Sequence, residues 1–175
     1  MNHTSPNRHR KLANRSGQAV LEFMFTFLIL MVLLFGLIDF GRALLMRLVM
    51  SNLSREAANL TSRGTSLSDA MTSLLNSASP LDVNAKGYVV LTEVGRDTNG
   101  IPVVVQQLTA GGQTTHSHIG DGIGAAAVIP RPDELPATNR NLFVAEVFYR
   151  FDSITPVGNL LGFNTVPMLY DAAFF

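Results

Sequence analysis

The sequence contains no cysteine and few charged residues. The absence of cysteine excludes disulfides, thiolate metal sites and cysteine nucleophiles, so folding has to rest on packing alone. Charged residues make up 15% of the chain and hydrophobic residues 47%, whereas a typical soluble domain has about 25% charged residues. The 175 residues are enough for one domain of ordinary size with an appendage. The apolar excess must therefore be located along the chain.

Common catalytic and phosphate-binding motifs are also missing. The chain has no glycine-rich phosphate loop, no HExxH, no GxSxG and no carboxylates at an acid–base spacing. His116 and His118 could share a metal, but two histidines in a Gly/Thr-rich loop are more typical of a solvated polar loop. Glu93, Glu146 and Arg150 lie on strand-like segments, where a surface ion pair would account for them. We therefore expect no enzyme, no bound metal and no cofactor.

The apolar excess lies in residues 19–38, where Glu22 is the only ionisable residue. Twenty helical residues at about 1.5 Å each cover the roughly 30 Å hydrocarbon core of a bilayer, which predicts a transmembrane helix. Residues 1–16 are polar, lack apolar periodicity and are expected to be disordered. The leader cations before the span, with no acidic residue among them, are Arg8, Arg10, Lys11 and Arg15.

These cations indicate the topology. By the positive-inside rule the N-terminus stays in the cytoplasm and everything after residue 38 is exported. Basic tracts also bind nucleic acids, but four cations directly before a span are more typical of a topology signal. We expect a single-pass membrane protein with no nucleic-acid partner.

The helix is expected to continue beyond the membrane. No proline occurs between Gln18 and Gly64, and Gly64 follows Arg63 as at a helix C-terminus. This predicts one helix of about 45 residues, with 18–38 in the membrane and 39–64 exported. Apolar residues at three-to-four spacing predict its buried face, and they are Leu45, Val49, Leu53, Ala57 and Leu60.

Residues 65–175 are predicted to form an exported α+β head. Ser66 and Asp69 form a capping-box pattern at the start of a short helix that ends near Ser77. Alternating or β-branched segments predict a small antiparallel sheet of about four strands. The candidate segments are 88–94 and 101–108, joined by a turn, a short strand at 123–129, a half-buried strand at 142–152, a helical turn around Leu160 and Leu161, and a closing strand at 168–175.

A carboxylate inside a membrane span needs an explanation. At the bilayer centre Glu22 would cost about 3 kcal/mol on insertion scales, but about 6 Å from the start of the span it can partly reach the interface. Snorkelling alone could account for it. The neighbouring residues favour another explanation, because Gly17 is followed by Gln18-Ala19-Val20-Leu21 and then by the glutamate.

This junction resembles the prepilin pattern of a basic leader, a glycine, four mostly apolar residues and a glutamate before a continuous apolar helix. The segment after it resembles the TadE-like proteins of the tight-adherence (Tad/Flp) pilus system, in which an Asp-Phe-Gly-Arg-like turn and a later Arg-Glu-Ala/Gly step recur. The corresponding residues are Asp39-Phe40-Gly41-Arg42 and Arg55-Glu56-Ala57. The resemblance covers about residues 15–63.

The resemblance implies a minor pilin or pseudopilin of a bacterial inner membrane that takes part in assembly of an adhesion pilus. A prepilin peptidase would cut between Gly17 and Gln18, removing leader residues 1–17 and leaving a cationic α-amino group. Glu22, followed by Phe23, could then pair with the amine of a neighbouring subunit during assembly. The implied partners are the peptidase, other pilins or pseudopilins and the inner-membrane pilus platform. Because Gln18 replaces the methylatable phenylalanine of many pilins, we do not expect N-methylation.

Three questions remain open from the sequence. Asp39 with Arg42 and Arg55 with Glu56 could form charge pairs within the helix or between subunits. The subunit could belong to the shaft, the tip or the base of the pilus. The competing interpretation is an uncleaved, signal-anchored envelope protein whose exported domain binds a ligand or partner.

Overall fold

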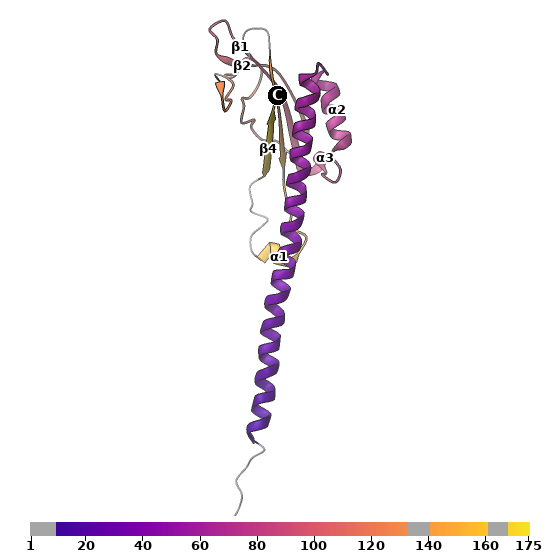
Figure 1. Cartoon of the computed structure of the whole chain (residues 1–175), viewed down its shortest axis with the longest axis vertical. Helices are drawn as coiled ribbons and strands as arrows, with labels where there is room; N and C mark the ends of the chain where they lie inside the picture. Colours follow the sequence, from indigo (N-terminus) through magenta and orange to yellow (C-terminus); the bar gives the residue numbers. More distant parts are fainter. Residues whose placement is uncertain (1–9, 133–140, 161–167) are drawn as a thin grey trace, which may run out of the picture.

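The structure, a computed structural model, describes residues 10–132, 141–160 and 168–175. One very long helix, α1, carries a four-stranded antiparallel sheet against its C-terminal half (Figure 1). The predicted fold class, α+β with a long apolar N-terminal helix and a small antiparallel sheet, is confirmed.

Helix α1 spans Arg10–Ser62, 53 residues, or about 80 Å at 1.5 Å per residue. Since it begins at Arg10, the expected disorder of residues 10–16 is wrong; residues 1–9 of the predicted leader lie outside the described residues. The predicted C-terminus is confirmed. Gly64 has a φ of +93°, in the left-handed region that favours glycine, and the N–H of Thr65 donates to the carbonyl of Leu60 at 3.2 Å.

The two halves of α1 have different surroundings. The first half is long and apolar enough to cross a membrane, and the head leaves it uncovered. In the second half the predicted register is partly wrong, because Leu45 is 50% exposed and the buried face instead includes Met46 and Met50. This part of α1 carries apolar residues on more than one side. The stripe with Leu45 and the stripe with Met46 and Met50 both fit a three-to-four spacing, so the spacing alone does not show which stripe is buried.

The sheet has the strand order β2-β1-β3-β4 and all its pairs are antiparallel. The predicted hairpin and the two later strands are confirmed, with β1 at Gly87–Arg96, β2 at Pro102–Gly111, β3 at Leu142–Tyr149 and β4 at Leu169–Phe174. The strand expected at 123–129 is wrong, since only an isolated bridge joins Ala126 to Val103. Gly122 and Gly124, with φ of +90° and +84°, interrupt any regular extended conformation there.

Three short helices complete the described head. Helix α2, Leu67–Ser77, starts as predicted, because the side chain of Ser66 accepts a hydrogen bond from the N–H of Asp69 at 3.1 Å. Helix α3 spans Val83–Lys86 and precedes β1. Helix α4, Pro156–Leu160, includes the first of the two residues around which a helical turn was predicted; Leu161 lies outside the described residues.

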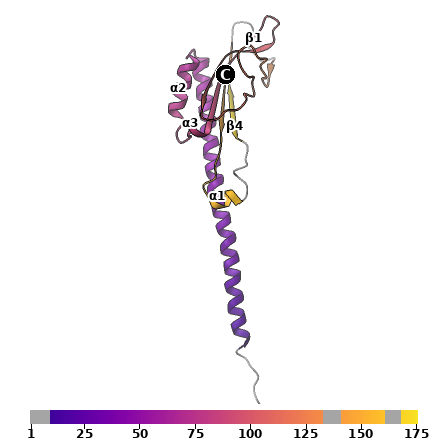
Figure 2. The same ribbon diagram turned by 180° about the vertical axis from the view of Figure 1, so that it is seen from behind.

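Both faces of the sheet are covered at its two central strands, β1 and β3. Helices α1 and α2 lie on one side of it (Figures 1 and 2) and form the main core with Val89, Leu91 and Val147. The loop after β2 covers the other side, where Ile119 packs against the sheet. Strand β3 is therefore buried on both faces rather than half-buried as predicted. This arrangement sets the surroundings of every candidate residue in the head.

Candidate functional site

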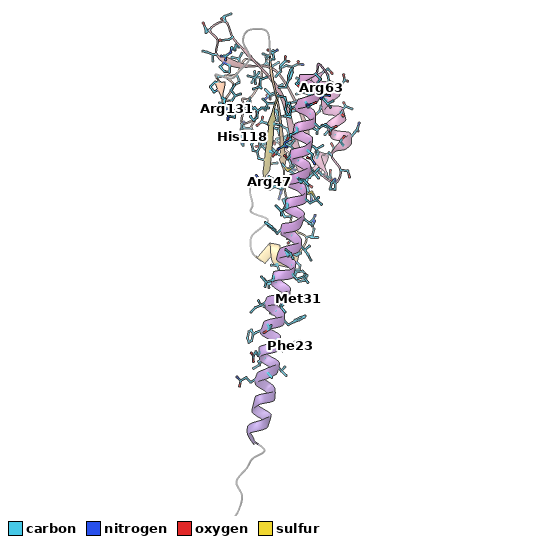
Figure 3. All side chains as sticks on the ribbon, viewed as in Figure 1. Phe23, Met31, Arg47, Arg63, His118 and Arg131 are labelled. Carbon is cyan, nitrogen blue, oxygen red and sulfur yellow. The ribbon has the colours of Figure 1, made fainter. Side chains whose placement is uncertain are left out.

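The predicted processing residues lie on the uncovered half of α1. Gly17 and Gln18 are exposed and belong to the first turns of α1. This end of α1 lies far from the head (Figure 1). A Cβ at Gly17 would meet no atom within 4 Å, so nothing in the described chain blocks an approach to this backbone. Glu22 and Phe23 are exposed one to two turns later, and Figure 3 labels Phe23 on this part of α1. The structure thus leaves these four residues accessible to another protein or to lipid.

Asp39 marks the point where the head begins to bury α1. Among residues 17–62 it is the first buried residue, with 2% of its surface exposed. Its carboxylate accepts hydrogen bonds from the Ser153 hydroxyl, from Thr155 Oγ1 at 2.5 Å and from the N–H of Ile154 at 3.1 Å. We call these four residues the Asp39 clamp. It fastens the loop after β3 to the helix directly beyond the apolar half.

The electrostatics of the clamp favour an ionised carboxylate. Burial by itself would raise the pKa of Asp39, but the hydrogen bonds from Ser153, Thr155 and Ile154 outweigh it and hold the pKa below its ordinary value. Gly158 closes the clamp from α4. A Cβ there would overlap the Ser153 hydroxyl, and its N–H donates to Thr155 Oγ1 at 3.3 Å. Asp39 is therefore a charged anchor surrounded by its own donors.

Arg42 does not pair with Asp39. Its Nη1 donates to the main-chain oxygen of Asp152 at 3.5 Å, and its guanidinium lies 5.8 Å from the ring centroid of Phe151. Two more cations meet the same aspartate, because Lys86 Nζ lies 3.0 Å from Asp152 Oδ2 and Arg150 Nε lies 3.6 Å from Oδ1. The hydrogen bond to Asp152 raises the pKa of Lys86. Arg42, Lys86, Arg150 and Asp152 are called the Asp152 cluster below.

The other helix-motif residues make no charge pair within the chain that the structure describes. Gly41 is exposed, and a Cβ there would meet nothing within 4 Å. Arg55 and Glu56 are both exposed, and consecutive residues of a helix do not face each other. Of the two open alternatives, an intrahelical pair is thus disfavoured for both Asp39/Arg42 and Arg55/Glu56.

Glu146 is the residue that sequence reasoning placed wrongly. It was expected in a surface ion pair but is fully buried, with 0% exposed, beneath the loop after β2. Its carboxylate accepts hydrogen bonds from Ser117 Oγ at 2.5 Å, from the N–H of His118 at 2.9 Å and from Tyr170 Oη at 3.1 Å. Burial, with the negative charge of Glu146 beside it, raises the pKa of Tyr170. The apolar residue Phe148 lies on the same face of β3 as Glu146, and this could have indicated that the face is covered.

The two histidines point to different partners. His116 Nδ1 lies 2.6 Å from Asp121 Oδ2 at the surface. The ring of His118 packs against Tyr170, with ring centroids 4.3 Å apart, and against Phe148 at 5.5 Å. Within the described ranges no group of three or more His, Cys, Asp or Glu residues could hold a metal ion. The contact with Asp121 accounts for His116, and aromatic packing accounts for His118.

The fold and these residues define a class: a protein with one long N-terminal helix, apolar enough in its first half to cross a membrane and bearing an α+β head on its second half. The model of the family described as TadE-like protein matches residues 17–59. The match begins at Gly17 and includes Glu22 and the Asp39 and Arg55 motifs. The match covers about a quarter of the chain and confirms the resemblance over this range, where the chain is similar to TadE-like proteins and consistent with a TadE-like protein of the Tad pilus system. No curated protein and no solved structure matches the chain.

Proposed function

We propose that this protein is a minor pilin or pseudopilin that a prepilin peptidase cuts between Gly17 and Gln18 and that takes part in assembly of a Tad/Flp-type adhesion pilus. The observation that carries the proposal is the TadE-like match starting at Gly17, on a half-helix that the head leaves uncovered. Its role is structural rather than catalytic. Its partners are the peptidase, other pilins or pseudopilins and the inner-membrane pilus platform.

The geometry of α1 supports a single-pass topology. Residues 18–38 span about 31 Å at 1.5 Å per residue, which fits the roughly 30 Å hydrocarbon core. Asp39 follows directly, and its clamp fastens the head at this point. The four leader cations favour a cytoplasmic N-terminus and an exported head. Before assembly the protein would therefore stand in the inner membrane, and afterwards in the pilus.

The exported half of α1 also has an apolar face that the head does not cover. Phe40, Leu44 and Leu48 are 61%, 53% and 61% exposed, and their spacing of four places them along one side of the helix. Lipid can cover such a face only as far as the bilayer extends. A neighbouring helix that runs parallel to α1 would cover it both in and beyond the membrane, which supports side-by-side packing of subunits.

Glu22 lies on the same side of the helix as this face. Leu44 follows Glu22 by 22 positions, which at about 100° per residue places the two side chains within roughly 40° of each other around the helix axis. A helix that packs on Leu44 would therefore also meet the carboxylate. Cleavage gives such a neighbour a cationic amine at Gln18, a partner that offsets the cost of a carboxylate in apolar surroundings.

Replacing Glu22 with glutamine is expected to lower co-assembly without preventing synthesis or cleavage. An amine left without its carboxylate in an apolar bundle costs about 3–5 kcal/mol, so cross-linking to other pilins should fall at least about tenfold. The measurement is in-cell cross-linking of the mature chain and counting of pili. The matched control is Glu93→Gln, which alters a carboxylate of the head that accepts a hydrogen bond from Asn141. This control should leave the cross-linking and the number of pili at wild-type levels. Wild-type assembly with Glu22→Gln would contradict the pairing.

A further inference from the structure

The Asp152 cluster brings more positive than negative charge to the end of the head that adjoins the apolar half of α1. Lys86, Arg150 and Arg42 converge on Asp152 at 3.0, 3.6 and 3.5 Å. The nearby carboxylate of Asp39 is buried and turned toward its own three donors. The side chains of Lys86 and Arg150 remain 43% and 61% exposed. Three cations and one accessible carboxylate leave capacity to bind an external anion.

The position of the cluster along α1 matches a membrane surface. Arg42 follows Ile38, the last residue of the apolar segment, by four positions, or about 6 Å. The polar headgroup layer on each side of the hydrocarbon core is about 5–8 Å thick. Arg42 and Asp152, which its guanidinium contacts, therefore lie at the depth of lipid phosphates when residues 18–38 span the bilayer.

An exposed apolar residue lies closer to the membrane-spanning segment than the Asp152 cluster does. Ile154 is 64% exposed, and its N–H donates to the carboxylate of Asp39, which places it beside the end of the span. An apolar side chain at the acyl boundary with cations directly above it is the arrangement by which proteins bind the surface of anionic membranes. The Asp39 clamp fixes the position of Ile154 relative to the cations of the Asp152 cluster.

We infer that the Asp152 cluster and Ile154 together bind anionic phospholipid, with the cations on its phosphate and Ile154 among its acyl chains. The lipid belongs to the leaflet on the side of the head. This contact would hold the head at a fixed height on the bilayer until the subunit leaves the membrane. The inference rests on the single-pass topology proposed above but does not depend on cleavage or on pilus assembly.

The chain has no tryptophan, so Ile154→Trp gives a single reporter. The full chain with this change is reconstituted into bilayers that contain brominated phosphatidylglycerol or brominated phosphatidylcholine, whose bromines quench tryptophan fluorescence. We expect stronger quenching by the brominated phosphatidylglycerol. Adding Lys86→Gln and Arg150→Gln should lower the preference for this lipid by roughly fivefold per cation, the factor that corresponds to about 1 kcal/mol for each Lys or Arg near an anionic surface.

Two controls separate the possible failures. Arg63→Gln removes a cation at the far end of α1 (Figure 3) and should leave the lipid preference unchanged. Leu30→Trp, alone, reports on the span and should be quenched by both lipids. If it is not quenched, the topology and this inference both fail. If it is quenched but the reporter at position 154 shows no preference, or one that survives loss of Lys86 and Arg150, the inference alone is overturned.

Discussion

Replacing Asp39 with alanine is expected to release the segment 151–160 from α1 and to lower the free energy of unfolding of the head by about 3–5 kcal/mol, the usual cost of removing one partner of a buried charged group. Alanine leaves the hydroxyls of Ser153 and Thr155 and the N–H of Ile154 without their acceptor, and water compensates for part of this loss once the segment is released. The measurement is the unfolding transition of the full chain in detergent, together with hydrogen exchange at the Ile154 amide.

Two milder changes, the substitution Asp39→Asn and protonation of Asp39 at low pH, are compared with Asp39→Ala. Asp39→Asn keeps an oxygen acceptor but loses the charge, so it should cost less than alanine. Because the pKa of Asp39 is lowered in the fold, its stabilisation is present above its unfolded pKa of about 3.8 and is lost as the pH falls through the still lower folded pKa. Asp69→Asn alters an exposed carboxylate of α2 and serves as the control. An unchanged transition and a protected Ile154 amide in Asp39→Ala would contradict the anchoring role.

The second large effect is expected at Glu146. Changing it to alanine opens a cavity in the covered face of the sheet and leaves Ser117, the N–H of His118 and Tyr170 without an acceptor. Loss of a buried group that satisfies several donors costs about 3–5 kcal/mol. We expect a lower unfolding midpoint and rapid proteolysis in the loop after β2. Glu146→Gln keeps the shape and one acceptor and should retain most of the stability.

Proteolysis distinguishes this explanation from a general loss of folding. In Glu146→Gln and in the control Glu93→Gln the loop after β2 should be cut at nearly the wild-type rate. In Glu146→Ala cleavage in that loop should precede cleavage in α2, which packs on the opposite face. Equal rates in all three variants would show that Glu146 does not hold the loop.

The features predicted best from the sequence are those fixed by neighbouring residues. The apolar run fixes the candidate span, Ser66 and Asp69 fix the start of α2, and Gly64 fixes the end of α1. Each of these depends on contacts within a few positions of the chain. The junction at Gly17 and Glu22 also depends on neighbouring residues alone, and its processing stays a prediction.

The features that were missed depend on contacts between distant segments. Ser153 and Thr155 meet Asp39 from more than 110 positions away along the chain, and hydroxyl residues in a loop give no periodic signal. Leu45 was assigned to the buried face because both sides of α1 are apolar there. Glu146 was placed at the surface because the loop that covers it has no regular strand or helix to reveal its position.

If the chain is a processed subunit, as proposed, the N-terminus of the protein made in cells will show it. Intact mass and N-terminal sequencing are compared with and without the prepilin peptidase. Gly17→Val should block processing, whereas Gly36→Val, at a glycine with equally open surroundings, should not. We expect a mature chain that begins at Gln18 only when the peptidase is present. A chain that retains residues 1–17 in both strains would contradict this expectation and favour the uncleaved, signal-anchored alternative.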